Sequence, residues 1–400
     1  MAGGTRSYEF AKRLVESGHD VQMITADNEG LHGERERWTE TNEDGIDVHW
    51  FRQRYSNRLR YGKRMLAFFR FAMAASGKAR RLGGDVVFAT STPLTVALPG
   101  VYASRMLRIP MVFEVRDLWP ELPIALGALR SRVLVHLARR LERFAYSYAS
   151  HIIALSPGMR DGVIRNGFPK DRIAVIPNAS DTQLFSCSRE EGRAFLEQHI
   201  PELPLRVVTY AGTLGMANGV GYLVDIAKEM RSLDRDVGFL IVGEGKERDL
   251  IHGRAQEAGV LGESLWMLPR VPKRDMPKVL GGSDVATSFV IDVPAMWNNS
   301  ANKFFDALAA SRPMAINHQG WQAELLERSK AGIVLPPSDP QGAAARLKEF
   351  LSSEERLEEA SIAARRLAEQ EFDRDLLFER FQATILAAAK DRPTKRRRRY

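Results

Sequence analysis

The sequence has one cysteine, Cys187, among its 400 residues. A single thiol excludes an internal disulfide and a zinc site built from cysteines, and it is typical of a reducing compartment. The chain also lacks any run of 18 or more apolar residues, the length that a membrane-spanning helix needs. Met1 leads into Ala-Gly-Gly, so we expect no signal peptide. These absences predict a cytoplasmic protein, either free or held at the inner face of the plasma membrane.

Acidic residues are missing from residues 52–81, where ten lysines and arginines stand among aromatic and aliphatic side chains. The whole chain has 58 basic and 50 acidic residues, so this segment alone exceeds the net charge of +8. Such a mixture suits anionic lipid head groups. We expect the membrane-surface residues to be Arg58, Arg60, Lys63 and Arg64. The alternative is a solvated helix with an ordinary apolar face toward the core.

Short apolar runs alternate with helical patterns through most of the chain, which predicts parallel sheets covered by helices. The expected strands are 21–25, 86–89, 111–115, 152–155 and 174–176, then 206–211, 237–242, 265–268, 285–288 and 314–317. These two series indicate an α/β protein with two Rossmann-like, doubly wound domains. An irregular stretch after Pro177 separates them. We predict domains over 1–180 and 181–375, followed by a C-terminal helix and basic tail over 376–400.

Glycines directly precede the first helix of the chain. Gly3 and Gly4 stand before a helical pattern over 6–17, which Gly18 closes. In doubly wound folds a glycine turn of this kind follows a strand. We therefore expect that the first strand of the N-terminal domain lies before residue 1 and is missing from the chain as given.

Glycine turns follow two successive strands of the second series. Gly212 and Thr213 end the strand over 206–211, and Gly243 and Gly245 follow the strand over 237–242. Backbone N–H groups at such turns and at helix starts can hold a diphosphate. A tight turn is the alternative for either pair alone. The sequence has no Gly-x-Gly-x-x-Gly and no Walker-type loop, which disfavours a dehydrogenase and a P-loop enzyme.

The order of motifs along the chain resembles a known family. The stretches GGTRSYEFAKRLVESGHDV, FEVRDLWPE, ALSPGM, VIPN, YAGTLG, VGEG, RVPK, NKFFDALAASRPMAIN and GIVLPPSDP cover nearly the whole sequence. In this order they resemble retaining glycosyltransferases of family 4, and especially bacterial polysaccharide and N-acetylfucosaminyltransferase-like enzymes. The resemblance implies a GT-B fold, in which an N-terminal acceptor-binding domain and a C-terminal nucleotide-sugar-binding domain face a cleft.

The family signature is a pair of glutamates eight residues apart, of which the first lies near the donor sugar and the second on the nucleotide ribose. Asp306 stands at the second position and keeps a carboxylate, whereas Asn298 stands at the first and keeps only neutral hydrogen bonding. Many members also grip the diphosphate with an arginine and a lysine after the strand that corresponds to 206–211. Here Thr213 and Asn218 lie in that region, so the resemblance assigns the cationic role to other residues.

Lysines and arginines must then stabilise the charge that grows on the leaving diphosphate. The resemblance places Lys303 and Arg270 or Lys273 there, and Arg116 and Asp117 after the strand over 111–115. The predicted catalytic residues are Lys303, Arg116, Asp117 and Asn298. The predicted nucleotide-sugar-binding residues are Gly4, Gly212, Thr213, Gly243, Gly245, Arg270, Lys273, Lys303 and Asp306.

These residues predict a glycosyltransferase that needs no metal and no cofactor. The two Asp-x-Asp strings, at 234–236 and 373–375, lie in charged, loop-like surroundings typical of surface. The resemblance implies a UDP-sugar donor, with an N-acetylated hexosamine as the sugar. The basic segment adds a lipid-linked acceptor and an anionic membrane surface as partners, and we expect no nucleic acid. The alternatives are a non-hydrolysing nucleotide-sugar epimerase and a non-enzymatic, basic membrane- or nucleic-acid-binding protein.

Overall fold

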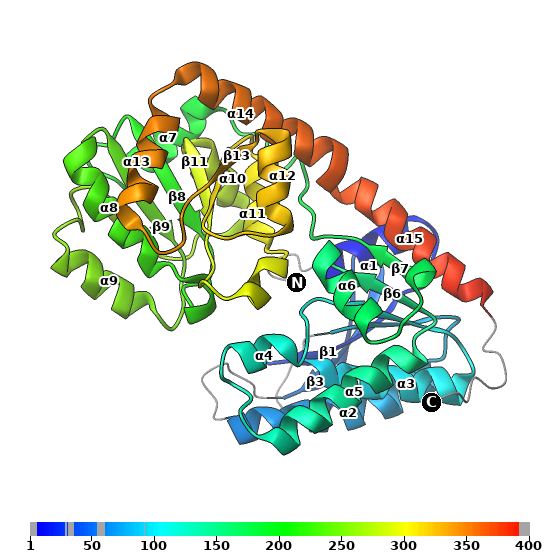
Figure 1. The fold of residues 1–400 in the computed structure, drawn as a ribbon. Coiled ribbons are helices and arrows are strands. Elements are labelled where there is room, and N and C mark those ends of the chain that lie inside the picture. The colour runs from blue at the N-terminus through cyan, green and yellow to red at the C-terminus, as the bar shows by residue number, and fades with distance from the viewer. Residues whose placement is uncertain (1–5, 29, 31–35, 54–60, 92, 392–400) are drawn as a thin grey trace. The chain divides into compact units, whose positions relative to one another are not determined.

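The computed structural model describes residues 6–28, 30, 36–53, 61–91 and 93–391. The chain forms two compact units (Figure 1). Unit 1 comprises residues 1–176 and 378–400, and unit 2 comprises 177–377. Both units are α/β and contain parallel sheets.

The described strands of unit 1 form two sheets. The first has the order β1-β3-β2, and the second is a parallel sheet with the order β4-β5-β6-β7. Their bounds are β1 Gln22–Asp27, β2 Trp38–Glu43, β3 Ile46–Arg52, β4 Val87–Thr90, β5 Met111–Val115, β6 His151–Ala154 and β7 Ile173–Val175. Within the described residues no hydrogen-bonded pairing joins β1 to β4, so the strands of this domain stand in two sheets. The α/β architecture with parallel sheets confirms the predicted fold class.

A hairpin that the sequence reading missed joins β2 to β3. Both residues of its turn have positive φ, Asp44 at 51° and Gly45 at 82°. That conformation matches the twist of antiparallel strands and is the one that Asp-Gly favours. β3 also pairs in parallel with β1, so the hairpin adds an antiparallel strand to one edge of the sheet.

Helices cover the sheets of unit 1. Their bounds are α1 Arg6–Glu16, α2 Tyr61–Leu82, α3 Ala97–Leu107, α4 Glu121–Ala125, α5 Arg132–Tyr148, α6 Pro157–Arg165 and α15 Arg374–Lys390. α3 packs against both α2 and α5, and these three helices run side by side along one side of the strands (Figure 1). α15 begins in unit 2 and ends in unit 1, where Phe378 and Phe381 pack on Phe10 of α1.

A buried ion pair ties α1 to the sheet of unit 1. Arg6 Nε donates to Glu114 Oε1 at 2.8 Å, and Arg6 Nη2 donates to the carbonyl of Ile176 at 2.8 Å. Thr90 donates to the other oxygen of Glu114 at 2.7 Å. A buried carboxylate is tolerated only with such partners, so Glu114 has a structural role here.

Unit 2 contains one six-stranded parallel sheet with the order β10-β9-β8-β11-β12-β13. The strand bounds are β8 Arg206–Ala211, β9 Val237–Val242, β10 Leu265–Leu268, β11 Val285–Ser288, β12 Met314–Ile316 and β13 Gly332–Val334. The covering helices are α7 Arg189–Glu197, α8 Gly221–Leu233, α9 Arg248–Glu257, α10 Met276–Gly281, α11 Asn302–Ala309, α12 Trp321–Ser329, α13 Pro340–Leu351 and α14 Glu354–Leu367. This doubly wound sheet confirms the prediction for the second domain.

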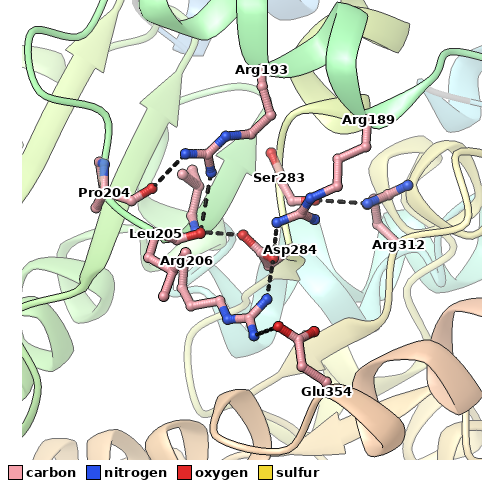
Figure 2. A network of polar contacts seen from close by, with 10 residues as sticks. Arg189, Arg193, Pro204, Leu205, Arg206, Ser283, Asp284, Arg312 and Glu354 are labelled. Carbon is pink, nitrogen blue, oxygen red and sulfur yellow. Dashed lines mark hydrogen bonds and ion pairs between the residues drawn. The ribbon is translucent and has the colours of Figure 1, made fainter.

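A network of polar side chains lies at the amino ends of the strands of this sheet (Figure 2). Asp284, which precedes β11, is buried and accepts the backbone N–H of Val207 in β8 at 2.8 Å. Arg189 and Arg206 donate to its other oxygen at 2.7 and 3.2 Å. Arg206 also pairs with Glu354 of α14. The network joins the strands β8 and β11 to the helices α7 and α14. It lies at the end of the sheet opposite the loops that follow the carboxyl ends of the strands.

Candidate functional site

The site in unit 2 lies at the carboxyl ends of the parallel strands. β8 is central, with β9 on one side of it and β11 on the other. In open parallel sheets, the loops after two such strands diverge and leave a crevice that binds ligands. The loop after β8 begins at Gly212, and Lys303 from α11 reaches it: the Lys303 side chain would lie 3.5 Å from a Cβ at Gly212.

Lys303 is held by groups of this loop. Its Nζ donates to Asn218 Oδ1 at 2.8 Å and to the hydroxyl of Tyr210 at 3.1 Å, and it lies 4.7 Å from the centre of the Tyr210 ring. Tyr210 and Asn218 both donate to the carbonyl of Thr213, at 2.8 and 2.9 Å. The ammonium group therefore has a fixed position but only neutral oxygens around it. Burial without a carboxylate lowers the pKa of Lys303 to about 7.

Asp306 lies three residues after Lys303 on α11, which places both side chains on the same face of the helix. Ser180 donates to Asp306 Oδ1 at 2.8 Å. Burial raises the pKa of Asp306 to about 6, while the Ser180 hydrogen bond and the positive charges of Arg374 and Lys273 act in the opposite direction. Asp306 is thus a carboxylate whose charge is only partly compensated.

The start of α11 adds a partial positive charge to the site. Its N-cap residue is Ala301, which cannot satisfy the first backbone N–H groups with a side chain. Uncapped N–H groups and the helix dipole favour an anion at this end. Together with Lys303, the second residue of the helix, they suit a phosphate group.

Buried polar atoms without a partner surround the same region, within the residues that the structure describes. Trp297 Nε1 belongs to the loop before α11, and His318 Nε2 and Gln322 Nε2 follow β12. Asn178 Oδ1 is also without a partner, although the Asn178 amide group donates to Ser300. Burial, and to a smaller extent the charge of Lys303, lower the pKa of His318, while a hydrogen bond with the Gln319 carbonyl acts in the opposite direction. Unsatisfied buried polar groups are costly, so several together indicate a polar ligand.

The glycines predicted here pack two loops against each other. A Cβ on Gly243 would lie 1.9 Å from the carbonyl oxygen of Gly212, and a Cβ on Gly245 would lie 2.0 Å from that of Leu214. Gly243 also has a φ of 152°, which an L side chain rarely adopts. These residues allow the loops after β8 and β9 to approach closely, and this contact shapes the loop beneath Lys303.

The remaining cations and Asn298 are spread over two segments. Arg270 is exposed in the loop after β10, while Lys273 opens a short helix, Lys273–Asp275, and is close enough to Asp306 to lower its pKa. Asn298 ends the short helix Pro294–Asn298 before α11 and is partly buried. The structure therefore groups Lys273 with Asp306, and leaves Arg270 at the surface of the unit.

Arg116 and Asp117 belong to unit 1, where they follow β5. The backbone N–H of Arg116 donates to Ser91 Oγ at 3.0 Å, and both side chains are partly exposed. Their assignment as catalytic residues stays a prediction. Of the other predicted residues of unit 1, Lys63 is exposed and Arg64 is partly buried on α2, and Gly4, Arg58 and Arg60 lie outside the described residues.

Sequence reasoning missed the residues that fix the two charged groups. Tyr210 and Ser180 were not predicted, and Asn218 was noted only as a replacement for a cation. Ser180 stands two residues after the VIPN motif, which is the one signal that could have found it. In the described residues, no three His, Cys, Asp or Glu side chains gather as metal ligands. Asp373, read as surface, instead accepts a hydrogen bond from Thr182 at 2.7 Å and one from the backbone of Asp375.

Two family models match the chain in succession. A glycosyl transferase 4-like domain matches residues 2–179, and a glycosyl transferases group 1 domain matches residues 205–353. The chain is 24% identical over 356 residues to a probable glycosyltransferase, WbjE, of Pseudomonas aeruginosa, which covers 85% of this chain and 84% of that protein. These matches favour glycosyl transfer over the epimerase and the non-enzymatic alternatives.

A second relative is the UDP-N-acetylglucosamine–N-acetylmuramyl-(pentapeptide) pyrophosphoryl-undecaprenol N-acetylglucosamine transferase of Symbiobacterium thermophilum. It is 28% identical over 284 residues, covering 70% of this chain and 67% of that protein. Among solved structures, HepE of Anabaena in complex with UDP and glucose superposes with a TM-score of 0.70 at 18% identity, over 92% of this chain and all of that one. The chain is a family 4-like glycosyltransferase with the GT-B fold.

Proposed function

We propose that the protein is a retaining glycosyltransferase that moves a sugar from a UDP-sugar to a lipid-linked acceptor in cell-surface polysaccharide synthesis. The observation that carries this proposal is the placement of Lys303 and Asp306 on one face of the first turns of α11, beside the loop after β8. A cation and a carboxylate at this spacing match the two ends of a nucleoside diphosphate. The solved structure of HepE contains UDP, which supports the choice of nucleotide.

In this proposal Lys303 binds the diphosphate. Its two present partners, Asn218 and Tyr210, are neutral, so a phosphate oxygen is a stronger acceptor for the ammonium group. The charge on the diphosphate grows as the bond to the sugar breaks. A cation and helix N–H groups that are already in position stabilise this charge without reorganising.

Asp306 binds the ribose. Its Oδ1 already accepts from Ser180, and a carboxylate has further lone pairs for the two ribose hydroxyls. The burial that raises the pKa of Asp306 also strengthens a hydrogen bond that it accepts, because the local dielectric is low.

An N-acetylated hexosamine fits the buried polar atoms near the loop before α11. Trp297 Nε1 and Gln322 Nε2 can donate, and Asn178 Oδ1 can accept. Hydroxyl and acetamido groups supply both kinds of partner. The name of the Symbiobacterium relative contains UDP-N-acetylglucosamine as donor and pyrophosphoryl-undecaprenol in its acceptor, which supports this sugar class and a lipid-linked acceptor. An acceptor of that kind would hold the enzyme at the inner face of the plasma membrane.

We further propose that transfer needs no divalent metal, because Lys303, the N-terminus of α11 and the nearby Lys273 supply positive charge at the diphosphate. Arg116 and Asp117 of unit 1 remain candidates for contacts to the acceptor.

A ligand panel tests the donor assignment. Purified protein is heated with UDP, GDP, ADP, UDP-glucose and UDP-N-acetylhexosamines, and the Tm is measured, since a ligand that binds the folded state stabilises it. We expect the largest shift with a UDP-N-acetylhexosamine. A larger shift with GDP or ADP than with UDP would contradict the nucleotide assignment.

A transfer assay tests the reaction. The preferred donor is incubated with a polyprenyl-diphosphate sugar in the presence of EDTA or of Mg²⁺, and products are followed by mass spectrometry. We expect an acceptor heavier by one sugar at equal rates in both conditions. Activity that EDTA abolishes would overturn metal-independence, and an epimerised donor without acceptor would overturn transfer.

A further inference from the structure

Exposed apolar side chains gather on three neighbouring helices of unit 1. In the described residues, ten of the eighteen exposed large apolar side chains belong to α2, α3 and α5. They are Leu66, Phe69, Met73, Tyr102, Met106, Val133, Leu134, Leu137, Phe144 and Tyr148. We call this set, with the lysines and arginines of the same helices, the three-helix face. Clusters of this kind on a soluble domain mark an interaction surface.

α2 contributes a regular stripe to the three-helix face. Leu66, Phe69 and Met73 recur at helical spacing, and Met73 is 77% exposed. Lys63 and Arg70 are exposed next to this stripe on the same helix. The opposite side of the helix is buried at alanines such as Ala67 and Ala75, so α2 packs inward with small residues and presents its large ones outward.

α5 leaves part of an apolar stripe exposed. Positions 129, 133, 137, 141 and 144 recur at helical spacing, a pattern that by itself favours a stripe facing the core. Instead Val133 is 68% and Leu137 54% exposed, while Ala145 and Tyr146 are buried. The physical reason is that α5 has two apolar sides, and its carboxyl half packs on the sheet through the side that holds Tyr146, which contacts Phe113 of β5. Leu129 is buried and Leu141 packs against the core of unit 1, whereas Val133 and Leu137 stay exposed.

The three helices form one continuous surface. α3 packs against α2 and against α5. The guanidinium of Arg105 on α3 lies 5.0 Å from the ring centre of Tyr148 on α5, and the Tyr148 and Phe144 rings are 4.8 Å apart. The same side of unit 1 carries all three helices in Figure 1.

Charge on the three-helix face has one sign. Within α2, α3 and α5 the sequence has eleven lysines and arginines and one acidic residue, Glu142. Glu142 is buried against Tyr146 and is not part of the surface. Arg132, Arg139 and Arg140 are exposed beside the apolar stripe of α5.

We propose that the three-helix face binds an anionic lipid bilayer, with the large apolar side chains entering the head-group boundary and the arginines and lysines contacting phosphates. Interfacial helices combine these two residue classes in this way, and each basic residue adds to attraction by an anionic surface. A second copy of the same face would bring like charges together, which disfavours self-association through it. No described helix is long and apolar enough to span a membrane, so the binding is peripheral. Membrane binding would bring the enzyme to the lipid-linked acceptor of the proposed function. Only this biological purpose rests on the proposed function.

Vesicle flotation tests the proposal. The full chain is mixed with phosphatidylcholine vesicles, or with vesicles containing 30% phosphatidylglycerol, and the bound fraction is measured at low and high salt. We expect at least tenfold tighter binding to the anionic vesicles, weakening as salt rises. A triple variant, Met73→Ser, Val133→Ser and Leu137→Ser, and a separate variant, Arg132→Gln, Arg139→Gln and Arg140→Gln, should each weaken that binding at least tenfold.

Matched controls use exposed residues of unit 2. Leu205→Ser, Leu250→Ser and Ile362→Ser match the apolar variant in exposure, and Arg235→Gln, Arg328→Gln and Arg366→Gln match the basic one in charge removed. The controls should bind vesicles like the parent. Equal loss in control and face variants, no vesicle binding by the parent, or equal binding to neutral vesicles would each overturn the proposal. So would a dimer of the parent that the face variants abolish, because it would assign the surface to a second copy.

The thermal shift with UDP separates this inference from the proposed function. Face variants should keep the full UDP shift, which shows that they are folded and that unit 2 binds its ligand. Vesicle binding without any UDP shift in the parent would refute the donor site and leave the membrane surface standing.

Discussion

Lys303 and Asp306 stand three residues apart on α11, and burial moves their pKa values toward each other, to about 7 and about 6. Lysine is charged below its pKa and aspartate above its own. Both groups are therefore mostly charged, and able to bind a nucleoside diphosphate, only in a narrow pH range between about 6 and about 7. We therefore expect ligand binding to be strongest near neutral pH, with the two flanks of the pH profile set by different residues.

The alkaline flank belongs to Lys303. We expect UDP to bind more weakly as the pH rises above about 7, since the ligand-free protein loses the ammonium charge there. Lys303→Met should weaken UDP binding by roughly 10- to 100-fold at pH 6.5, the value of a charged hydrogen bond, and remove this flank. Titration calorimetry with UDP between pH 5.5 and 9 measures both effects. Lys303→Arg, which does not titrate in this range, should flatten the flank as well; a persistent alkaline flank in both variants would contradict the assignment.

The acidic flank belongs to Asp306. Protonation below about pH 6 removes acceptor capacity, so we expect nucleotide affinity to fall as the pH decreases. Asp306→Asn should weaken binding about tenfold at pH 7, by the order of one hydrogen bond to a charged group, and should remove the flank. Uridine provides the discriminating ligand, because it has the ribose but no diphosphate. Its binding should respond to Asp306→Asn and not to Lys303→Met; the reverse pattern would exchange the two roles.

Gly245 tests whether the contact between the two glycine loops supports the site. Gly245→Ala places a Cβ about 2.0 Å from the carbonyl oxygen of Leu214, a backbone atom that cannot move alone. We expect a loss of about 1–3 kcal/mol in the free energy of unfolding, typical of overpacking, together with weaker UDP binding. Gly253→Ala in α9 is the matched control, since nothing lies within 4 Å of its Cβ. Alanine there should stabilise the helix by about 0.5–1 kcal/mol, measured by urea unfolding.

Most of the fold could be predicted because buried parallel strands are continuous apolar runs. Each of the ten expected strands is present within two residues of its predicted bounds. β2, β3 and β13 were not among the predicted strands. The sequence of β2, WTETNE, is polar and lies at a sheet edge, although the Asp44-Gly45 pair that joins it to β3 is a hairpin signal. The orientation of α5 could not be predicted either, because periodicity finds an apolar stripe without showing what it packs against.

The site also has a part that the sequence predicts and a part that it does not. Lys303 and Asp306 were found through the family resemblance, and their spacing on one helix follows from the sequence alone. The residues that contact them are brought there only by the tertiary structure. Asn218 and Ser180 lie 85 and 126 residues from the side chains that they contact, so no local pattern joins them. The roles of Arg116 and Asp117 depend on a bound acceptor and stay predictions.

Asp284 is expected to be the strongest electrostatic contributor to the stability of unit 2. Its carboxylate is almost fully buried and accepts from Val207 N–H and from Arg206. Asp284→Ala should cost about 3–5 kcal/mol in the free energy of unfolding, because it removes the acceptor of the buried Val207 N–H and the buried partner of Arg206. Glu354, 80% exposed, pairs with the same arginine and supplies the control. Glu354→Gln should cost less than about 1 kcal/mol; equal losses would refute this ranking.

Glu142 in unit 1 should make stability decrease with pH. It is buried between α5 and α6, where Tyr146 and Asn166 donate to its Oε1 at 3.1 and 3.3 Å. Burial, and then the charge of Glu121, raise the pKa of Glu142 to about 7. A carboxyl whose pKa is higher in the folded than in the unfolded protein binds its proton more tightly when folded. Its contribution to stability is therefore present at low pH and is lost as the pH rises through about 7.

Glu142→Gln keeps the acceptor oxygen and removes the charge. Relative to the parent, we expect the variant to gain about 1 kcal/mol in the free energy of unfolding between pH 6 and pH 8, the value of one pH unit of linkage. Urea unfolding at both pH values measures it, and taking the difference between variant and parent removes contributions from Lys303 and other groups. Glu121→Gln should shift the loss to lower pH, because the pKa of Glu142 falls when the charge of Glu121 is removed. A variant that follows the parent at both pH values would show that Glu142 is already ionised at pH 6.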